Sequence, residues 1–311
     1  RGAPLDWEFA VINVESDRKT SDTLAELIEE LRAKVLPVID DAHEAILVLT
    51  AVVKDLQDDE KGVQKLLVNL NSIADKIDSI CGCFSAGLVP TGASDPYALR
   101  RQGIGIVQIL KDKGFSFSLR DLIQDSVTQF GGKSDQERID LIENVYSFLR
   151  NRISHLLAED GYSKDTVAAV LNVSCDNIPQ TWSRVGALEK LKAKPDFEPL
   201  AAAFKRVVNI IRKADDFQTT AVDQKLFQHE SETALLAAYE AVKMKVEDHL
   251  QKDLFDRALV EIASLRDAVD AFFDGVMVMA DDMAVRRNRL ALLGLIAALF
   301  GGFADFSKLS T

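Results

Sequence analysis

Apolar residues recur every three or four positions through most of this chain, and few helix breakers interrupt them. The segments between loops are rich in Ala, Leu, Glu and Lys, and the 311 residues include only 7 prolines. This spacing gathers apolar side chains on one side of an α-helix, whereas a half-buried strand requires strict alternation. The pattern therefore predicts an all-α, multi-helix protein that ends in an antiparallel helical bundle.

The same periodicity and its interruptions give approximate helix limits. We expect helices at about 60–85, 96–113, 118–130, 134–160, 163–172, 180–194, 198–214, 229–250, 253–274 and 282–300. Upstream, residues 1–18 contain an extended segment, and Ser21 is expected to cap a helix that Pro37 interrupts.

Residues 87–96, "GLVPTGASDP", form the clearest loop signal in the chain. Asp95 is a natural N-cap for the helix that follows, and Pro96 suits the first helical position because its missing N–H is not needed there. Gly114 is expected to end that helix in a left-handed conformation. The punctuated stretch 192–199, "KAKPDFEP", is a second break and a candidate domain boundary.

Charge and cysteine content limit the class of protein. The formal net charge of −12 argues mildly against a free-standing nucleic-acid binder, which usually carries a basic face. Three cysteines cannot build a disulfide framework, so we expect a cytoplasmic protein. The apolar run 290–303 contains three glycines and is shorter than the roughly 20 residues that span a bilayer, so we expect a buried terminal helix and no membrane contact. A start at Arg1 suggests a piece of a longer protein.

The usual catalytic constellations are missing from the sequence. There is no nucleotide-binding glycine motif and no metalloprotease motif, and four scattered histidines lack metal-ligand spacing. The glycines of "GIGIVQI" (103–109) are better explained by close helix packing than by phosphate binding. Cys81 and Cys83 are most simply small helix residues, and Met277 and Met279 most simply pack in a core. We expect no catalytic residue, no metal site and no cofactor in this chain.

Two basic clusters remain as candidate binding residues. Lys205, Asn209 and Arg212 share one side of the helix expected at 198–214, and residues 196–213 hold four bases against two acids. Arg286 and Arg289 lie three positions apart in a second helix. Arginine suits anion recognition because its planar fork can hold a phosphate or a base edge through two hydrogen bonds. Spacing alone favours a simpler explanation, in which these arginines pair with nearby acids on a solvated helix surface.

Three motifs, in order, resemble one known family. The block "ADKIDSICGCFSAGLVPTGASDPYALRRQGIGIVQIL" (74–110) is similar to a block of the bacterial-type glycyl-tRNA synthetase β subunit. The stretch "DAVDAFFDGVMVMADDMAVRRNRLALL" (267–293) resembles the end of that subunit's anticodon-binding domain, and "KRVVNIIRK" (205–213) resembles its opening helix. The resemblance covers residues 71–311; Phe204, where the family usually has a polar residue, and Arg287, where it usually has an apolar one, depart from it.

The resemblance implies a fold and a division of the chain. Its domain type, named after an Asp-Ala-Leu-Arg signature and shared with arginyl-tRNA synthetases, is an antiparallel helical bundle. We accordingly expect a helical body at 71–185 and an anticodon-binding bundle at 186–311. Residues 1–70 are left unassigned and mostly helical.

The resemblance also implies a function. This chain would be the tRNA-binding, anticodon-recognising part of glycine–tRNA ligase, an aminoacyl-tRNA synthetase. ATP-dependent attachment of glycine, with its ATP and Mg²⁺, would belong to a separate α subunit. The implied partners are tRNA(Gly) and the α subunit, in a heterotetramer, and not DNA. The tRNA-contacting candidates are Lys205, Arg206, Asn209, Arg212, Arg286 and Arg289, and the family-signature residues are Asp95, Pro96, Arg100 and Arg101.

A hypothesis of another class stays open at this point. The chain could be a non-catalytic helical scaffold whose apolar segment 290–303 and first 70 residues meet a polypeptide partner. Such a module would be indifferent to tRNA, whereas an anticodon reader would bind it in an anticodon-dependent way.

Overall fold

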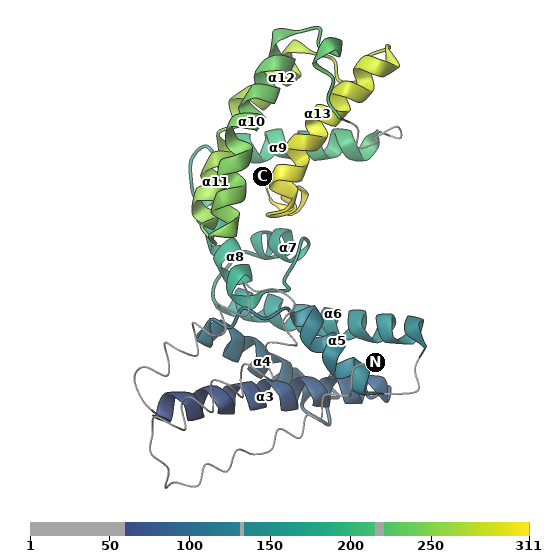
Figure 1. The fold of residues 1–311 in the computed structure, drawn as a ribbon, viewed down its shortest axis with the longest axis vertical. Coiled ribbons are helices and arrows are strands. Elements are labelled where there is room, and N and C mark those ends of the chain that lie inside the picture. Colours follow the sequence, from purple (N-terminus) through teal and green to yellow (C-terminus); the bar gives the residue numbers. More distant parts are fainter. Residues whose placement is uncertain (1–59, 131–133, 215–220, 311) are drawn as a thin grey trace, which may run out of the picture. The chain divides into compact units, whose positions relative to one another are not determined.

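The computed structural model describes residues 60–130, 134–214 and 221–310 (Figure 1). The predicted extended segment at 1–18 and the predicted cap at Ser21 lie outside these ranges. Within them, regular structure is helical throughout, apart from one isolated bridge between Thr91 and Ser94. The all-α prediction is therefore confirmed. The chain divides after Tyr146 into two compact units.

The N-terminal unit is built on one long helix. It contains α3 (Glu60–Ser85), α4 (Leu99–Lys113), α5 (Leu119–Gln129) and the start of α6 (Asp135–Glu159), and both α4 and α5 pack on α3. Gly105 sits at the α3–α4 contact, where a Cβ would lie 3.1 Å from the Lys76 side chain. Gly105 therefore serves close helix packing, as predicted, and Gly103 is buried in the same helix.

The cysteines of this unit are helix residues. Cys81 and Cys83 both lie in α3, and Cys81 is fully buried. Burial raises the pKa of the Cys81 thiol to about 12, which keeps it protonated and unreactive at neutral pH.

The start of α4 differs from the prediction. The N-cap residue is Ala98 and not the predicted Asp95, although the Asp95 carboxylate does accept hydrogen bonds from the backbone N–H groups of Leu99 (2.8 Å) and Arg100 (3.0 Å). The helix begins at Leu99, and Pro96 lies in the preceding turn instead of at the first helical position. Ala98 adopts φ 53°, so the chain makes a left-handed residue after Pro96 before the helix can start. Gly114 ends the helix at φ 67°, as expected.

The C-terminal unit holds the remainder of α6 and the helices after it. These are α7 (Lys164–Leu171), α8 (Ile178–Lys192), α9 (Phe197–Lys213), η2 (Gln224–Leu226), α10 (Glu230–Gln251), α11 (Phe255–Ala263), α12 (Arg266–Gly275), α13 (Met283–Gly301) and η3 (Phe306–Lys308). Helix α10 packs on α11, α12 and α13, while α9 packs on α12 and α13 (Figure 1). The predicted buried terminal helix is α13, and no helix of the described ranges could cross a membrane.

Three phenylalanines join α9 to the end of the chain. The ring of Phe204 stacks on Phe300 at 4.5 Å between centroids, and Phe306 meets both rings edge-on at 5.4 Å. All three side chains are essentially fully buried. Phe204, a departure from the family pattern, is thus a core residue that orients α9 and turns its opposite side to solvent.

The segment 253–274 forms two helices instead of the single one predicted. Ser264 ends α11, and its hydroxyl donates to the carbonyl of Glu261 (2.7 Å), competing with the regular backbone pattern. The turn buries Leu265 completely before α12 begins at Arg266. An apolar period cannot reveal this break because both helices keep their apolar residues on the inner side.

The chain beyond α13 is tied back to the unit by polar contacts. The buried Arg184 donates from Nε to the carbonyl of Phe303 (3.2 Å), and the backbone N–H of Ser310 donates to Asp165 (2.7 Å). Asp165 also pairs with Lys192 at 2.6 Å. Burial opposes ionisation of Asp165, but the hydrogen bonds from Lys192 and Ser310 prevail and hold its pKa well below the usual range.

Candidate nucleic-acid interface

Helix α9 carries the first basic cluster on its outer side. Its inner side is apolar, with Ala201, Phe204 and Val207 buried, so the intervening positions face outward. The predicted residues Arg206, Asn209 and Arg212 are exposed, as is Lys213, and Lys205 is partly buried. From 201 to 213 the helix contains no acidic residue. The sequence prediction that Lys205, Asn209 and Arg212 share one side of this helix is confirmed. We call Lys205, Arg206, Asn209, Arg212 and Lys213 the α9 basic face.

Beside this face lies an open groove between α9 and the segment after α12. The Arg206 guanidinium stands 4.1 Å from the centroid of the Phe273 ring, a cation–π contact across the groove wall. The groove has a volume of about 470 Å³. We call it the Arg206 groove, and it is lined by Arg206, Ile210, Phe273, Asp274, Gly275, Val276, Met277, Val278 and Met279.

The methionines of this segment are exposed, which corrects the prediction that they pack in a core. Met277 is 76% exposed and Met279 is 44% exposed, while Val278 between them is buried. The segment is not helical after Val276, whose backbone is extended. The backbone bends at Val278 and Met279, and this non-helical segment leaves both methionines at the surface while Val278 is buried.

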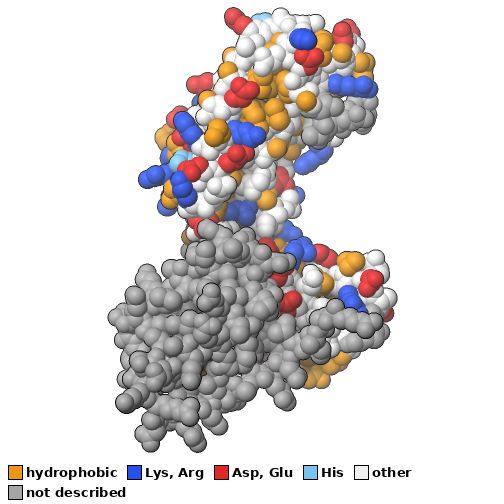
Figure 2. Space-filling model, in the orientation of Figure 1, with side chains coloured by type: hydrophobic (Ala, Val, Ile, Leu, Met, Phe, Trp, Pro, Cys, Tyr) orange, Lys and Arg blue, Asp and Glu red, His pale blue; other side chains and the backbone are white. Residues whose placement is uncertain are grey.

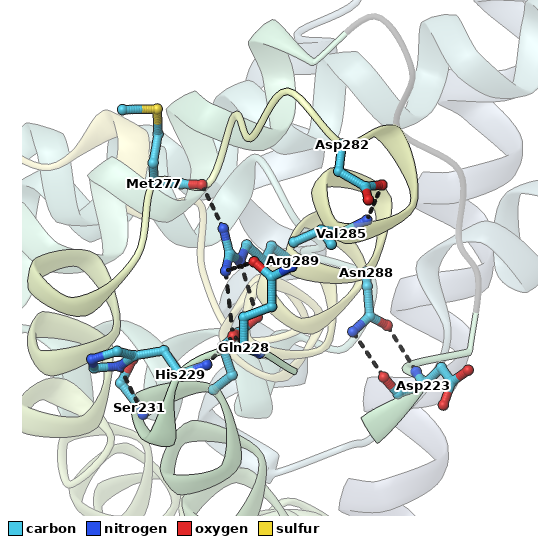
Figure 3. Close-up of polar contacts among 10 residues, drawn as sticks. Asp223, Gln228, His229, Ser231, Met277, Asp282, Val285, Asn288 and Arg289 are labelled. Carbon is cyan, nitrogen blue, oxygen red and sulfur yellow. Dashed lines mark hydrogen bonds and ion pairs between the residues drawn. The ribbon is translucent and has the colours of Figure 1, made fainter. Parts of the chain in front are cut away.

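The second basic cluster, Arg286 and Arg289 of α13, donates hydrogen bonds to backbone carbonyls of the segment that carries the methionines. Arg289, predicted to contact tRNA, is buried and donates from Nη1 to the carbonyl of Met277 (3.0 Å). Arg286, also predicted to contact tRNA, is partly buried and donates from Nε to the carbonyl of Ala280 (2.8 Å). Figure 3 shows the Met277 carbonyl directed at Arg289 and the Met277 side chain directed away from it. The structure thus assigns both arginines to the scaffold of the groove, whereas Arg287 between them in the sequence is exposed.

A buried carboxylate, which sequence reasoning missed, completes this scaffold. Glu232 pairs with Arg289 at 3.0 Å between Oε1 and Nε, and the two side chains are 0% and 7% exposed. Glu232 also accepts hydrogen bonds from the backbone N–H groups of Gln228 (2.8 Å) and His229 (2.9 Å). Burial would raise the pKa of Glu232, but the Arg289 bond and these backbone donors outweigh it and lower that pKa.

The missed scaffold residues do have weak local signals. His229 and Glu232 form the capping box of α10, and a glutamate three positions after a helix cap is a recognisable spacing. Asn288 had no such signal. Its amide brackets the backbone of Asp223, accepting from the N–H at 2.8 Å and donating to the carbonyl at 2.9 Å (Figure 3). Only the folded chain brings these two residues together, because 65 positions separate them.

The family-signature residues lie in the other compact unit. Asp95 and Pro96 lie just before α4, Arg100 is partly buried, and Arg101 is exposed. All four belong to the N-terminal unit, whereas the α9 basic face belongs to the C-terminal unit. Across the described ranges the surface carries both charge signs, and Figure 2 shows acidic and basic side chains interspersed on the visible part of the C-terminal unit.

Two family models match this chain. The glycyl-tRNA synthetase beta subunit model covers residues 44–172, and the DALR anticodon binding domain model covers residues 200–302. The first match begins at residue 44, so the similarity, which was predicted for 71–311, extends to residues 44–70 as well. The second match contains the α9 basic face, the Arg206 groove and the Arg289–Glu232 pair.

Curated relatives agree with both models. A glycine–tRNA ligase beta subunit of Desulfatibacillum aliphaticivorans is 52% identical over 242 residues, and those of Desulforapulum autotrophicum and Geotalea daltonii are 48% and 45% identical. The matches cover 76–77% of this chain and 34% of each relative, so the chain spans about a third of their length. The chain belongs to the family of glycyl-tRNA synthetase β subunits, within which it carries a DALR-type anticodon-binding domain.

Proposed function

We propose that this chain is the tRNA-binding, anticodon-recognising part of a glycine–tRNA ligase β subunit. The observation that carries the proposal is the acid-free α9 basic face inside the segment matched by the anticodon-binding model. Single-stranded RNA loops are recognised by stacking and by hydrogen bonds to base edges, while cations hold the phosphates. The α9 basic face offers the cations, and the neighbouring Arg206 groove offers an apolar surface.

In this proposal the chain supports a reaction whose chemistry lies elsewhere. Attachment of glycine to tRNA would use ATP and Mg²⁺ at a separate α subunit, in a heterotetramer of α and β subunits. Within the described ranges no group of three or more acidic, cysteine or histidine side chains is placed to hold a metal ion. The role of this chain would be to hold the anticodon loop of tRNA(Gly), in the cytoplasm.

A net charge of −12 is compatible with this role because binding depends on local charge. The α9 basic face concentrates its cations on one helix, and phosphate neutralisation makes affinity fall steeply with salt. The remaining acidic surface would repel RNA that does not engage this face.

The test compares two tRNAs. Binding of the chain to glycine tRNA is measured at low salt beside the same tRNA with a changed anticodon, and we expect at least a tenfold preference, about 1.4 kcal/mol. Equal binding of both would mean that the chain senses only backbone charge, and no binding of either would favour the protein-interaction scaffold. A second comparison uses two variants that each remove one exposed arginine. Arg212→Ala lies on the α9 basic face, and Arg257→Ala is its matched charge control because Arg257 lies on α11.

A further inference from the structure

We propose that the Arg206 groove receives one unstacked nucleobase of a single-stranded RNA loop. The inference rests on the proposed function and goes one step further, because it names the chemical group that is bound and the residues that bind it. Its specific content is that Arg206, Met277 and Met279 contact a base, while the rest of the α9 basic face contacts phosphates.

The first support is the position of Arg206. Its guanidinium is held over the Phe273 ring, yet the side chain remains exposed and makes no ion pair with a carboxylate of the described residues. Arginine planes and aromatic rings are the surfaces on which proteins stack single-stranded bases. The ring orients the cation without neutralising it, so the charge stays available to a ligand.

The second support is the clustering of methionine. The whole chain has four methionines, and three of them, Met277, Met279 and Met283, fall within seven positions of the sequence; the first two line the groove. They are 76%, 44% and 39% exposed. Thioethers are polarisable and make favourable contacts with aromatic rings, and an exposed apolar cluster usually marks a binding surface. A flat aromatic base attached to an anionic backbone complements this combination of methionines and cations better than an acidic peptide does.

The third support is the rigidity imposed on the groove wall. Arg289 holds the carbonyl of Met277 (Figure 3), and Arg286 holds that of Ala280, so two backbone anchors fix the segment that presents the methionines. The Arg289 anchor is itself set by the buried Glu232. A surface ordered before binding loses less conformational entropy when the ligand arrives.

The four methionines also supply the experiment. The chain is treated with dilute hydrogen peroxide, with and without saturating glycine tRNA, and oxidation of each methionine is followed by mass spectrometry. Met244, which is 77% exposed on α10, is the internal control. It lies 12 residues beyond Glu232, or about 18 Å along the helix axis. We expect tRNA to slow oxidation of Met277 and Met279 in proportion to the fraction bound, and to leave Met244 unchanged.

The outcomes separate this inference from the proposed function. If tRNA binds and Met277 and Met279 oxidise as fast as before, the groove does not hold a base, although the proposed function stands. If the chain does not bind tRNA at any concentration tested, both the proposed function and this inference are wrong. Equal protection of Met244 would indicate a general effect of RNA on the oxidant and would also overturn the assignment.

Variants distinguish a base from a phosphate in the groove. Arg206→Lys keeps the charge but loses the planar group, and we expect it to weaken binding about tenfold with an unchanged salt dependence. Met277→Ala should weaken binding in the same direction, whereas the matched Met244→Ala should not. A series of RNAs, each lacking one base of the anticodon loop, locates the bound base. When the missing base is the one that the groove holds, wild type and Arg206→Lys should bind that RNA with equal affinity. If no abasic position has this effect, the groove senses phosphate and the proposal is wrong.

Discussion

The α9 basic face and the start of α13 look alike in sequence but behave differently in the folded chain. Both are helices that carry basic residues at helical spacing. On α9, Arg206 and Arg212 remain exposed, whereas on α13 Arg289 is buried against Glu232 and Arg286 bonds a loop carbonyl. The difference arises from the neighbouring elements: α10 brings a carboxylate to α13, and the segment after α12 brings carbonyl groups.

The two regions therefore depend on charge in different ways. An exposed cation keeps its hydration and can exchange water for a ligand phosphate at little cost. A buried cation has already lost its water, so its removal leaves an uncompensated partner in a medium of low polarity. Substitutions on α9 should mainly change RNA binding, and substitutions at the start of α13 should mainly change stability.

The largest expected effect is the loss of Arg289. Arg289→Ala leaves Glu232 buried without its cation, and the free energy of unfolding should fall by about 3–5 kcal/mol. Urea denaturation measures it. The exposed neighbour Arg287 is the matched control, and Arg287→Ala should stay within about 0.5 kcal/mol of wild type. A stable Arg289→Ala protein that loses RNA affinity would erase the contrast between the two regions.

A smaller loss of stability is expected at Asn288. Asn288→Ala removes both hydrogen bonds to the Asp223 backbone, so the N–H and the carbonyl of Asp223 lose their side-chain partner. The free energy of unfolding should fall by about 1–3 kcal/mol. Thermal unfolding monitored by circular dichroism is a suitable measurement. Asn209→Ala, on the exposed side of α9, is the control, and its unfolding temperature should be essentially unchanged. Equal shifts for both variants would show that the amide bracket does not stabilise α13.

The third effect concerns binding instead of stability. Arg212→Ala should weaken tRNA binding by about 1 kcal/mol, as for one exposed ionic contact. The slope of log affinity against log salt should fall by about 1, and the loss should be the same for every anticodon. Titrations at several salt concentrations measure both quantities. If the loss of affinity depended on the anticodon, Arg212 would contact a base and not a phosphate.

The smallest effect is a dependence of stability on acid. Because the pKa of Glu232 is lower in the folded chain than its ordinary 4.5, this group stabilises the fold fully above that pH, and the contribution is lost as pH falls through the folded-state pKa. Protonated Glu232 can still form hydrogen bonds, so the loss should be less than that caused by Arg289→Ala. Unfolding of wild type and Glu232→Gln between pH 6 and pH 3 should show a steeper decline in wild type. Parallel curves would mean that the ionised pair is not what stabilises this region.

The sequence alone determined most of the secondary structure. Apolar period and punctuation located α3 and the helices from α5 to α10 within a few residues, and Gly114 marked the end of α4, because these signals are local to a helix and its termini. Local signals failed where two arrangements share one pattern. The apolar period could not show the break at Ser264, nor the left-handed residue that delays α4 to Leu99.

The candidate site divides in the same way. Sequence spacing placed Lys205, Asn209 and Arg212 on one side of α9, because helical geometry follows from residue number. Only the tertiary structure decided that Arg289 is buried and that Met277 faces solvent. A side chain's exposure depends on which distant segment packs against it, and the partner of Arg289 lies 57 residues away in the sequence. The charge pattern of one helix carries no information about that partner. For this reason two similar basic clusters have different roles: the one on α9 is an exposed surface, and the one on α13 is part of the scaffold.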